Sequence, residues 1–126
     1  MSDPVISIEP LSEELLVAYA HSEMERGNAG KHAIEWAFGN NSKPFAVARD
    51  DGAIVGMSGY IQNRVVFGEA TGNAFQAVDS FVSKTMRGKG IFTRLAQAYD
   101  EYARDSGADL VWGFPNNNAA PAWYGK

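Results

Sequence analysis

Hydrophobic residues along the chain follow two different spacings, and the changes between them divide it into helices and strands. Near the N-terminal end, and again around Leu95, apolar residues recur three and four positions apart, as on one face of a helix. Between these parts they come in strand-like runs that are broken by the turn sequences DDG and GEATGN. The predicted elements, in chain order, are strand 5–8, helix 12–25, helix 31–38, strands 43–50, 53–67 and 74–83, helix 91–106, strand 108–114 and one more helical turn after residue 114.

This order predicts an α+β fold with a mixed, mainly antiparallel central sheet flanked by helices. The DDG sequence at Asp50–Gly52 is typical of a hairpin turn, so the strands on either side of it are expected to be antiparallel neighbours. Ser12 is a suitable N-cap for the first helix, and Leu11 can pack against Leu16. The strand 108–114 is apolar on both faces, which favours an internal place in the sheet. The face of helix 91–106 that is expected to meet the sheet carries Ile91, Leu95, Ala98 and Tyr102.

The composition excludes several classes of protein. A length of 126 residues, with 45% hydrophobic and 21% charged residues, is that of one soluble domain. The net charge of −4 gives no general attraction to nucleic acids or acidic membranes, and no apolar run approaches the roughly 20 residues of a membrane span. The chain has no cysteine and its two histidines lie far apart, so we expect no disulfide, no thiolate nucleophile and no metal. The start of the chain has neither the basic nor the apolar part of a signal peptide, and we expect a cytoplasmic protein.

The segment Arg87–Gly90, with the sequence RGKG, stands directly before the predicted helix 91–106. A helix N-terminus leaves backbone N–H groups without intrahelical acceptors and carries a partial positive charge. The glycines let these groups turn toward one point, the two cations add charge, and Thr93 adds a hydroxyl from the first turn. The pattern therefore favours a cradle for a phosphate or a diphosphate. A tight strand-to-helix connection with solvated cations is the alternative, and so short a pattern does not decide between the two.

Two known phosphate-binding loops do not fit this segment. A Walker A loop has a Lys-Ser/Thr pair after its second glycine, where this chain has Ile91 and Phe92. A dinucleotide-binding loop has a third glycine, where this chain has Thr93, and it follows a parallel strand rather than an antiparallel one. Lys84 and Arg94 complete the dense basic cluster of the chain, which supports anion binding. A nucleotide-binding protein that uses the same cradle stays open as an alternative.

These residues resemble the GNAT superfamily of acetyltransferases, whose core pattern after the fourth strand is Arg/Gln-x-x-Gly-x-Gly/Ala. The stretch Arg87–Phe92 matches this pattern except that Phe92 replaces the last small residue. The sequence RGKGIF, together with GFPN at Gly113–Asn116 and Pro121 beyond it, is similar to a branch that includes acetyltransferases associated with polysaccharide biosynthesis.

A second pattern of the superfamily, Asn-x-x-Ala-x-x-aromatic-Tyr-x-Lys, lies near the end of the chain. It is matched by Asn117, Ala120, Trp123, Tyr124 and Lys126. The resemblance implies that Asn117 contacts the pantetheine arm of acetyl-CoA or the loop before the helix. It also implies that Tyr124 protonates the departing thiolate; a buried tyrosine with a hydrogen-bonded hydroxyl is the alternative.

The resemblance further implies how acetyl-CoA would bind as the cosubstrate. The sheet of such enzymes splays between its fourth and fifth strands, and the pantetheine arm enters the gap like an extra strand. Phe81 and Val82 would supply the backbone groups for that arm. The diphosphate would be held by Arg87, Gly88, Lys89, Gly90, Ile91, Phe92 and Thr93. The acetyl group would then pass to a primary amine of a small molecule by direct attack in a ternary complex.

Attack by an amine needs a base, or a water chain that ends in one, because an ammonium ion is not a nucleophile. Asp79, on the predicted fourth strand, is the best-placed carboxylate in the sequence, with a solvent-facing strand residue as the alternative. Glu25 and Glu35 lie on helices that line the acceptor side in such enzymes, and a solvated helix face is the better interpretation for both.

Members of the superfamily usually continue past the Tyr-x-Lys pattern into two more strands, whereas this chain ends at Lys126. We expect a single domain over residues 1–126 that is shortened at its C-terminal end. We also expect its last strand to be covered by a second copy of the chain or by a strand from a partner, because an uncovered apolar strand aggregates. The same departure leaves a CoA-binding module without turnover as the alternative to an acetyltransferase.

Overall fold

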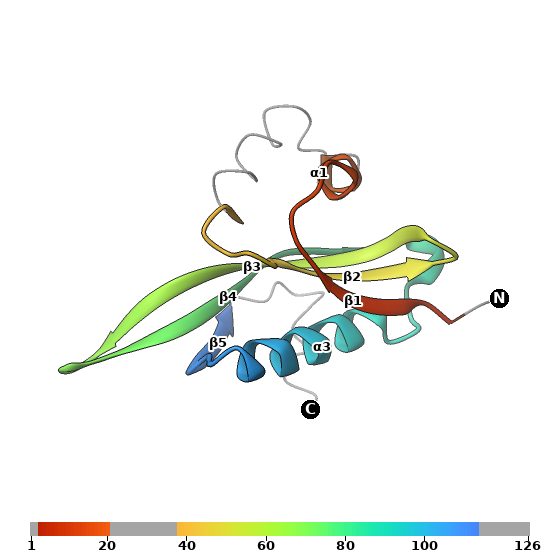
Figure 1. Cartoon of the computed structure of the whole chain (residues 1–126). Coiled ribbons are helices and arrows are strands. Elements are labelled where there is room, and N and C mark those ends of the chain that lie inside the picture. Colours follow the sequence, from red (N-terminus) through yellow and green to blue (C-terminus); the bar gives the residue numbers. More distant parts are fainter. Residues whose placement is uncertain (1–2, 21–37, 114–126) are drawn as a thin grey trace.

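The computed structural model describes residues 3–20 and 38–113 of the chain. They form a five-stranded sheet in the order β1-β2-β3-β4-β5, with α1 on one face and α3 on the other (Figure 1). Neighbouring strands are antiparallel except β4 and β5, which are parallel, so the predicted α+β class with a mixed, mainly antiparallel sheet is confirmed. The elements are β1 (Val5–Glu9), α1 (Glu13–Ala20), β2 (Phe45–Asp50), β3 (Ala53–Phe67), β4 (Ala70–Val82), a 3₁₀ turn (Lys84–Met86), α3 (Ile91–Asp105) and β5 (Leu110–Gly113).

The start of α1 follows from its capping residue. The backbone N–H of Leu15 donates to Ser12 Oγ at 3.2 Å, which satisfies one of the N–H groups that a helix leaves open at its start. Leu11 and Leu16 pack in the same apolar cluster, as the sequence predicts. The rest of the predicted first helix, and all of the predicted helix 31–38 except Phe38, lie outside the described residues.

A cluster of charges holds α1 against the sheet. The Arg49 guanidinium on β2 donates to both carboxylate oxygens of Glu9 on β1, at 2.8 and 3.0 Å. It also donates to both carboxylate oxygens of Glu14 on α1, at 2.8 and 3.1 Å. These hydrogen bonds hold the pKa of each carboxyl group below its usual value and raise the pKa of Arg49. One guanidinium thus links three elements.

The hairpin between β2 and β3 has the predicted turn. Asp51 and Gly52 have φ angles of 52° and 85°, and Asp50 pairs with Ala53 across them. Positive φ at both loop residues is the type I′ geometry, which matches the twist of the flanking strands. The bounds of β3 are the predicted ones.

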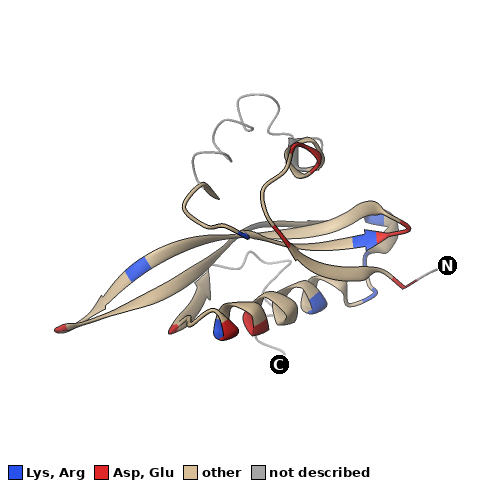
Figure 2. Ribbon diagram, viewed as in Figure 1, with Lys and Arg blue, Asp and Glu red and all other residues tan. Residues whose placement is uncertain are grey.

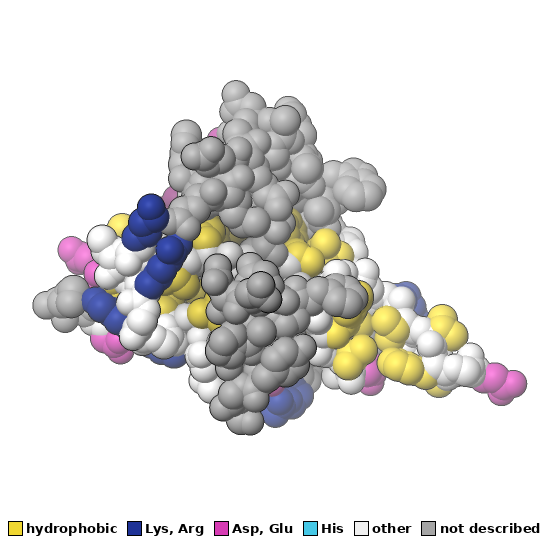
Figure 3. Space-filling model, turned by 180° about the vertical axis from the view of Figure 1, so that it is seen from behind, with side chains coloured by type: hydrophobic (Ala, Val, Ile, Leu, Met, Phe, Trp, Pro, Cys, Tyr) yellow, Lys and Arg dark blue, Asp and Glu magenta, His cyan; other side chains and the backbone are white. Residues whose placement is uncertain are grey.

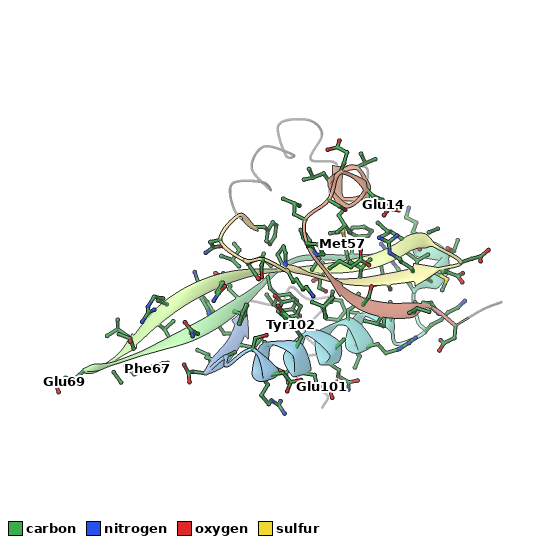
Figure 4. The ribbon with its side chains drawn as sticks, in the orientation of Figure 1. Glu14, Met57, Phe67, Glu69, Glu101 and Tyr102 are labelled. Carbon is green, nitrogen blue, oxygen red and sulfur yellow. The ribbon has the colours of Figure 1, made fainter. Side chains whose placement is uncertain are left out.

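The strand β4 begins at Ala70, earlier than the predicted strand 74–83. The turn is confined to Gly68 and Glu69, and Ala70 pairs with Phe67. The first residues of β4 lack the alternation of a strand, yet they form one because β3 supplies their hydrogen-bond partners. Neither β2 nor β5 pairs with this part, so β3 and β4 continue as a two-stranded arm with Phe67 and Glu69 at its tip (Figure 4).

The face of the sheet under α3 holds a core built around two stacked tyrosines. The rings of Tyr60 on β3 and Tyr99 on α3 lie 3.7 Å apart at an interplanar angle of 6°. Tyr99 Oη donates to the Lys43 carbonyl at 2.8 Å and accepts from Asn41 Nδ2 at 2.9 Å. Burial raises the pKa of both tyrosines, so both hydroxyls stay protonated.

These contacts decide which face of α3 is buried. The buried residues of the helix are Ile91, Leu95, Tyr99 and Ala103. The predicted face contains Ile91 and Leu95, and also Tyr102, which is half-buried and packs against the same cluster. Ala98 is only half-buried, and the prediction missed Tyr99 and Ala103. The error arises because the partners that draw Tyr99 into the core lie far away in the sequence.

The strand β5 pairs only with β4 and lies at the edge of the sheet formed by the described residues. Leu110, at its start, is 39% exposed. Within this part of the chain, the internal position predicted for the strand is therefore not found.

Candidate functional site

The predicted anion cradle is a turn that contains two left-handed glycines. Gly88 and Gly90 have φ angles of 78° and 75°, a conformation that costs a residue with a side chain roughly 1–2 kcal/mol. A Cβ added to either glycine would meet nothing within 4 Å. Glycine is therefore needed here for its backbone conformation and not for close packing.

The helix α3 begins without a side-chain cap. Its N-cap is Gly90, which has no side chain that could accept from the first N–H groups. The Arg94 N–H donates to the Gly90 carbonyl at 3.0 Å and closes the first turn. The N–H groups of Ile91, Phe92 and Thr93 come before it and have no acceptor one turn back. Together with the partial positive charge of the helix start, they make a site for an anion.

Lysine and arginine positions lie in the turn before α3 and at the start of α3 (Figure 2). Their side chains gather at one end of the molecule when it is seen from behind (Figure 3). The exposed members of the predicted cluster are Lys84, Arg87 and Lys89. Arg94 instead donates to Asp3 Oδ1 at 3.1 Å and to the Pro4 carbonyl at 2.9 Å. The fourth cation therefore ties α3 to the segment before β1.

Arg87 turns back toward β4, where its Nε donates to the Val82 carbonyl at 3.1 Å. The Ser83 N–H donates to the Val55 carbonyl on β3 at 2.8 Å. Because the backbone groups of successive residues in a strand point to alternate sides, those of Val82 point away from β3. Those of Phe81 point toward β3. Of the two residues expected to meet a pantetheine arm, Val82 thus has its backbone groups on the outer side of β4.

The strand β4 continues past the described end of β5. The parallel pair ends where Ala77 lies opposite Gly113, and β4 runs on to Val82. Among residues 3–20 and 38–113, no strand pairs with this last part of β4 on the side away from β3. Such an edge presents backbone N–H and C=O groups to an extended ligand.

A β-bulge in β4 lies at Asp79, the candidate base. Val78 is opposite Gly59 and Ser80 is opposite Ser58, so Asp79 has no residue opposite it on β3. The bulge follows directly on the part of β4 that pairs with β5. Bulges are frequent beside active sites because they re-aim the side chains that follow.

The bulge changes which face of the sheet the later side chains of β4 occupy. Phe75 and Ala77 belong to the cluster under α3, whereas Phe81 belongs to the cluster under α1. In an unbroken strand, Phe81 would share the face of Ala77, because side chains alternate with a period of two. Val82 returns to the α3 side for the same reason.

The structure brings the bulge, the outer side of β4 and the turn 87–93 into one continuous stretch of backbone. Asn117 and Tyr124 lie outside the described residues, and so do Glu25 and Glu35. The side chain of Asp79 is also outside what is described. The assigned roles of all these residues therefore stay predictions.

The sequence contained one signal for the bulge that the prediction did not use. A glycine inside a strand marks a bulge or a close approach, and Gly59 is such a residue. It lies opposite Val78, beside the bulge. A Cβ on Gly59 would lie 2.6 Å from Phe38 Cζ, so the absent side chain also makes room for that ring. No residue pattern in the sequence indicated the hydrogen bond from Arg87 to the Val82 carbonyl.

Neither a metal cluster nor a membrane helix is found in the part of the chain that the structure describes. There, no group of three or more His, Cys, Asp or Glu side chains is placed to hold a metal ion. No helix of that part has the length and apolar character needed to cross a bilayer.

The sequence matches one known family over most of its length. Residues 8–126 fit the profile of the Acetyltransferase (GNAT) family. The chain belongs to the GNAT acetyltransferase family. No curated protein matches its sequence.

Solved structures share the GNAT fold of this chain at low sequence identity. AAC(6')-Iy, in complex with the bisubstrate analogue CoA-S-monomethyl-acetylneamine, has a TM-score of 0.71 and 12% identity over 97% of this chain and 86% of that chain. A predicted acetyltransferase from Clostridium acetobutylicum with acetyl-CoA has a TM-score of 0.71 and 13% identity over 94% and 86%. An aminoglycoside acetyltransferase from an uncultured soil metagenomic sample has a TM-score of 0.68 and 21% identity over 98% and 90%. These likenesses establish the fold of the acyl-CoA N-acyltransferases.

Proposed function

We propose that this GNAT protein moves the acetyl group of acetyl-CoA to a primary amine of a small molecule. Family membership supports the reaction class, and two structural neighbours were crystallised with acetyl-CoA or a CoA conjugate. The observation that carries the proposal is the start of α3, where the left-handed Gly88 and Gly90 lead into a helix whose N-cap has no side chain. A diphosphate suits this arrangement of N–H groups.

Acetyl-CoA would bind with its diphosphate at the start of α3 and its pantetheine arm along β4. Its diphosphate would accept from the N–H groups of the turn 87–90 and of Ile91, Phe92 and Thr93, with Lys89 adding charge. Its pantetheine arm would lie along the outer side of β4, where the alternation of backbone groups favours Val82 over Phe81 as its partner. By donating to the Val82 carbonyl, Arg87 would fix the turn relative to that edge.

The chemistry would be direct attack of the amine on the thioester carbon in a ternary complex. A C–N bond forms and the C–S bond breaks, while a base takes a proton from the amine and an acid gives one to the departing thiolate. Asp79, at the bulge, is the proposed base, and Tyr124 is the proposed acid. Because a thioester is already activated, orientation and proton transfer are the contributions left to the protein.

An amino sugar is the amine that we propose to test first. One structural neighbour is an aminoglycoside acetyltransferase in complex with sisomicin, and another is a glucosamine-6-phosphate N-acetyltransferase. Both compounds belong to this chemical class.

Binding is tested by thermal shift with CoA, ATP and NAD. At about 100 times its Kd, CoA should add roughly 2.7 kcal/mol to the free energy of unfolding, and the other two ligands should add far less. The double variant Arg87→Ala/Lys89→Ala should weaken CoA binding. Lys43→Ala/Arg64→Ala removes the same charge from exposed positions away from the turn and serves as the control. Unchanged CoA affinity in the first variant contradicts the cradle.

Turnover is tested by thiol release from acetyl-CoA with a panel of amines. The chain has no cysteine, so a thiol reagent reports the released CoA without a background from the protein. Release that depends on an amine supports the enzyme. CoA binding without release for any amine supports the alternative, a CoA-binding module.

We also propose that a second copy or a partner strand covers β5, which lies at an edge in the described part of the sheet. Light scattering on the purified chain tests the second copy, which should double the molecular mass. The cytoplasmic location, the single domain over 1–126 and the absence of nucleic-acid and membrane partners stay predictions.

A further inference from the structure

Two hydrogen-bonded serines lie in the sheet beside the bulge, Ser58 buried and Ser80 half-buried. Ser58 on β3 lies opposite Ser80 on β4, and the Ser58 hydroxyl donates to Ser80 Oγ at 2.9 Å. Ser58 is only 2% exposed. A buried hydroxyl costs free energy unless it is hydrogen-bonded, and two apolar side chains in its place would carry no such cost. Packing alone therefore does not explain the serine pair, which indicates a functional role for its hydroxyls.

The serine pair lies on the face of the sheet that α3 covers. Ala46, Ser58 and Ser80 lie opposite one another across β2, β3 and β4. Ala46 belongs to the apolar cluster under α3. Met57 and Gly59, on either side of Ser58, instead face the cluster under α1. The pair thus shares a face with the helix whose start forms the anion cradle.

Ser80 also lies on the part of β4 that a pantetheine arm would follow. It comes directly after the bulge at Asp79 and beyond Ala77, the last residue that pairs with the described part of β5. Ser80 is two residues before Val82, so the backbone groups of both residues face the outer side of the strand. A ligand that passes Val82 from the cradle reaches Ser80 about 7 Å further on, at two residues of about 3.3 Å each.

The hydrogen bond within the pair leaves one proton available. A serine hydroxyl has one proton and two lone pairs. Either hydroxyl of the pair can rotate to be the donor; when Ser58 donates to Ser80 Oγ, the proton of the buried residue is used inside the pair. The proton of Ser80 can therefore be donated to a third group, and a hydroxyl that already accepts a hydrogen bond is a stronger donor.

We propose that Ser80 is a catalytic residue whose hydroxyl donates to the carbonyl oxygen of the acetyl thioester, and that Ser58 is a positioning residue that holds it. This rests on the proposed function, because it needs acetyl-CoA on β4. As the amine attacks, negative charge grows on the carbonyl oxygen, and a donor placed there stabilises the transition state. The charge returns to the carbonyl bond when the C–S bond breaks, and Ser80 keeps its proton throughout.

Calorimetry with two stable analogues tests the contact without any acceptor amine. Acetyldethia-CoA keeps the acetyl carbonyl and replaces the sulfur by a methylene, whereas S-ethyl-CoA lacks the acetyl carbonyl and keeps only the amide carbonyls of the pantetheine arm. Ser80→Ala should weaken binding of the first by about three- to tenfold, the effect of one hydrogen bond, and leave binding of the second unchanged. Ser58→Ala should have a smaller effect of the same pattern.

Kinetics separate a catalytic hydroxyl from a structural one. Ser80→Val should lower kcat by about 100-fold with little change in the KM for acetyl-CoA. Ser80→Thr has the shape of the valine variant but keeps the hydroxyl, so its kcat should be close to that of the wild-type chain. This pair of variants makes the comparison even if Ser80→Ala does not fold. Thr71→Val removes a hydroxyl from the exposed arm of β4, one that accepts from Arg64 at 3.3 Å, and should change nothing.

Each outcome bears on a different statement. If the wild-type chain binds acetyldethia-CoA and the Ser80 variants match it in affinity and kcat, the serine pair is structural and the inference is wrong. If the Ser80 variants lose both analogues equally, the inference is also wrong, because the carbonyl is then not what Ser80 contacts. If the wild-type chain binds no CoA analogue, the proposed function fails, and this inference fails with it.

Discussion

Replacing Gly59 by alanine would press a methyl group into two phenylalanine rings under α1. An added Cβ would lie 2.6 and 2.9 Å from Phe38 Cζ and Cε1, and 3.3 Å from Phe45 Cε1. The ring centroids are 4.9 Å apart, and the two residues are 2% and 0% exposed. Neither ring can swing into solvent, so the added methyl must displace part of the core.

The size of the effect follows from two opposing terms. Overpacking a buried core costs about 1–3 kcal/mol. Alanine in place of a strand glycine recovers roughly 0.5–1 kcal/mol, because the unfolded chain then has less conformational entropy to lose. We expect Gly59→Ala to lower the free energy of unfolding by about 1–2 kcal/mol. The melting temperature should fall by roughly 3–10 °C in a chain of this size.

Urea denaturation followed by circular dichroism measures this loss in a double-mutant cycle. Phe38→Leu removes the two ring atoms that the new methyl would meet, at a cost of its own. The double variant should be more stable than the sum of the single losses predicts, by about 1 kcal/mol. An equal cost of Gly59→Ala in both backgrounds would refute the steric explanation.

Three further variants test other parts of the structure. Gly90→Ala should cost roughly 1–2 kcal/mol, because position 90 has φ 75°, and should weaken CoA binding; urea denaturation and calorimetry measure the two effects. Ser12→Ala loses the bond to the Leu15 N–H and should cost about 1 kcal/mol in the same denaturation assay. Arg49→Met removes the donors that lower the pKa of Glu9. A carboxyl group whose pKa is lowered by folding stabilises the folded protein above its usual pKa of 4.5, and this contribution is lost as the pH falls through the folded-state pKa. Urea denaturation at a series of pH values should therefore show the stability of the wild-type chain falling more steeply below about pH 4.5 than that of Arg49→Met.

Features that depend on neighbouring residues were predictable from the sequence. The DDG turn, the Ser12 cap and the bounds of β3 all appear where the local pattern places them. The same holds for the glycine turn before α3, because a positive φ at Gly88 and Gly90 is set by the chain beside them. In each case the physical cause lies within a few residues.

Features set by distant partners were not predictable in this way. The early start of β4 depends on hydrogen bonds from β3, and the buried face of α3 depends on the stacking of Tyr99 on Tyr60. In the candidate site, the cradle was placed from the sequence, but the bulge at Asp79 was not. Whether a residue is an extra one is decided by the register of the opposite strand.

Because Asp79 is an extra residue in β4, the number of residues before the end of the strand, and not their type, decides which face of the sheet the later side chains occupy. Deleting that residue would carry Ser80, Phe81 and Val82 to the opposite faces and remove a carboxylate at the same time, so only a substitution such as Asp79→Asn isolates the carboxylate. Aligned straight through this position with a protein that lacks the bulge, residues on the α3 face of this chain would be compared with residues on the opposite face of the other sheet. A one-residue gap placed there keeps equivalent side chains in the same column.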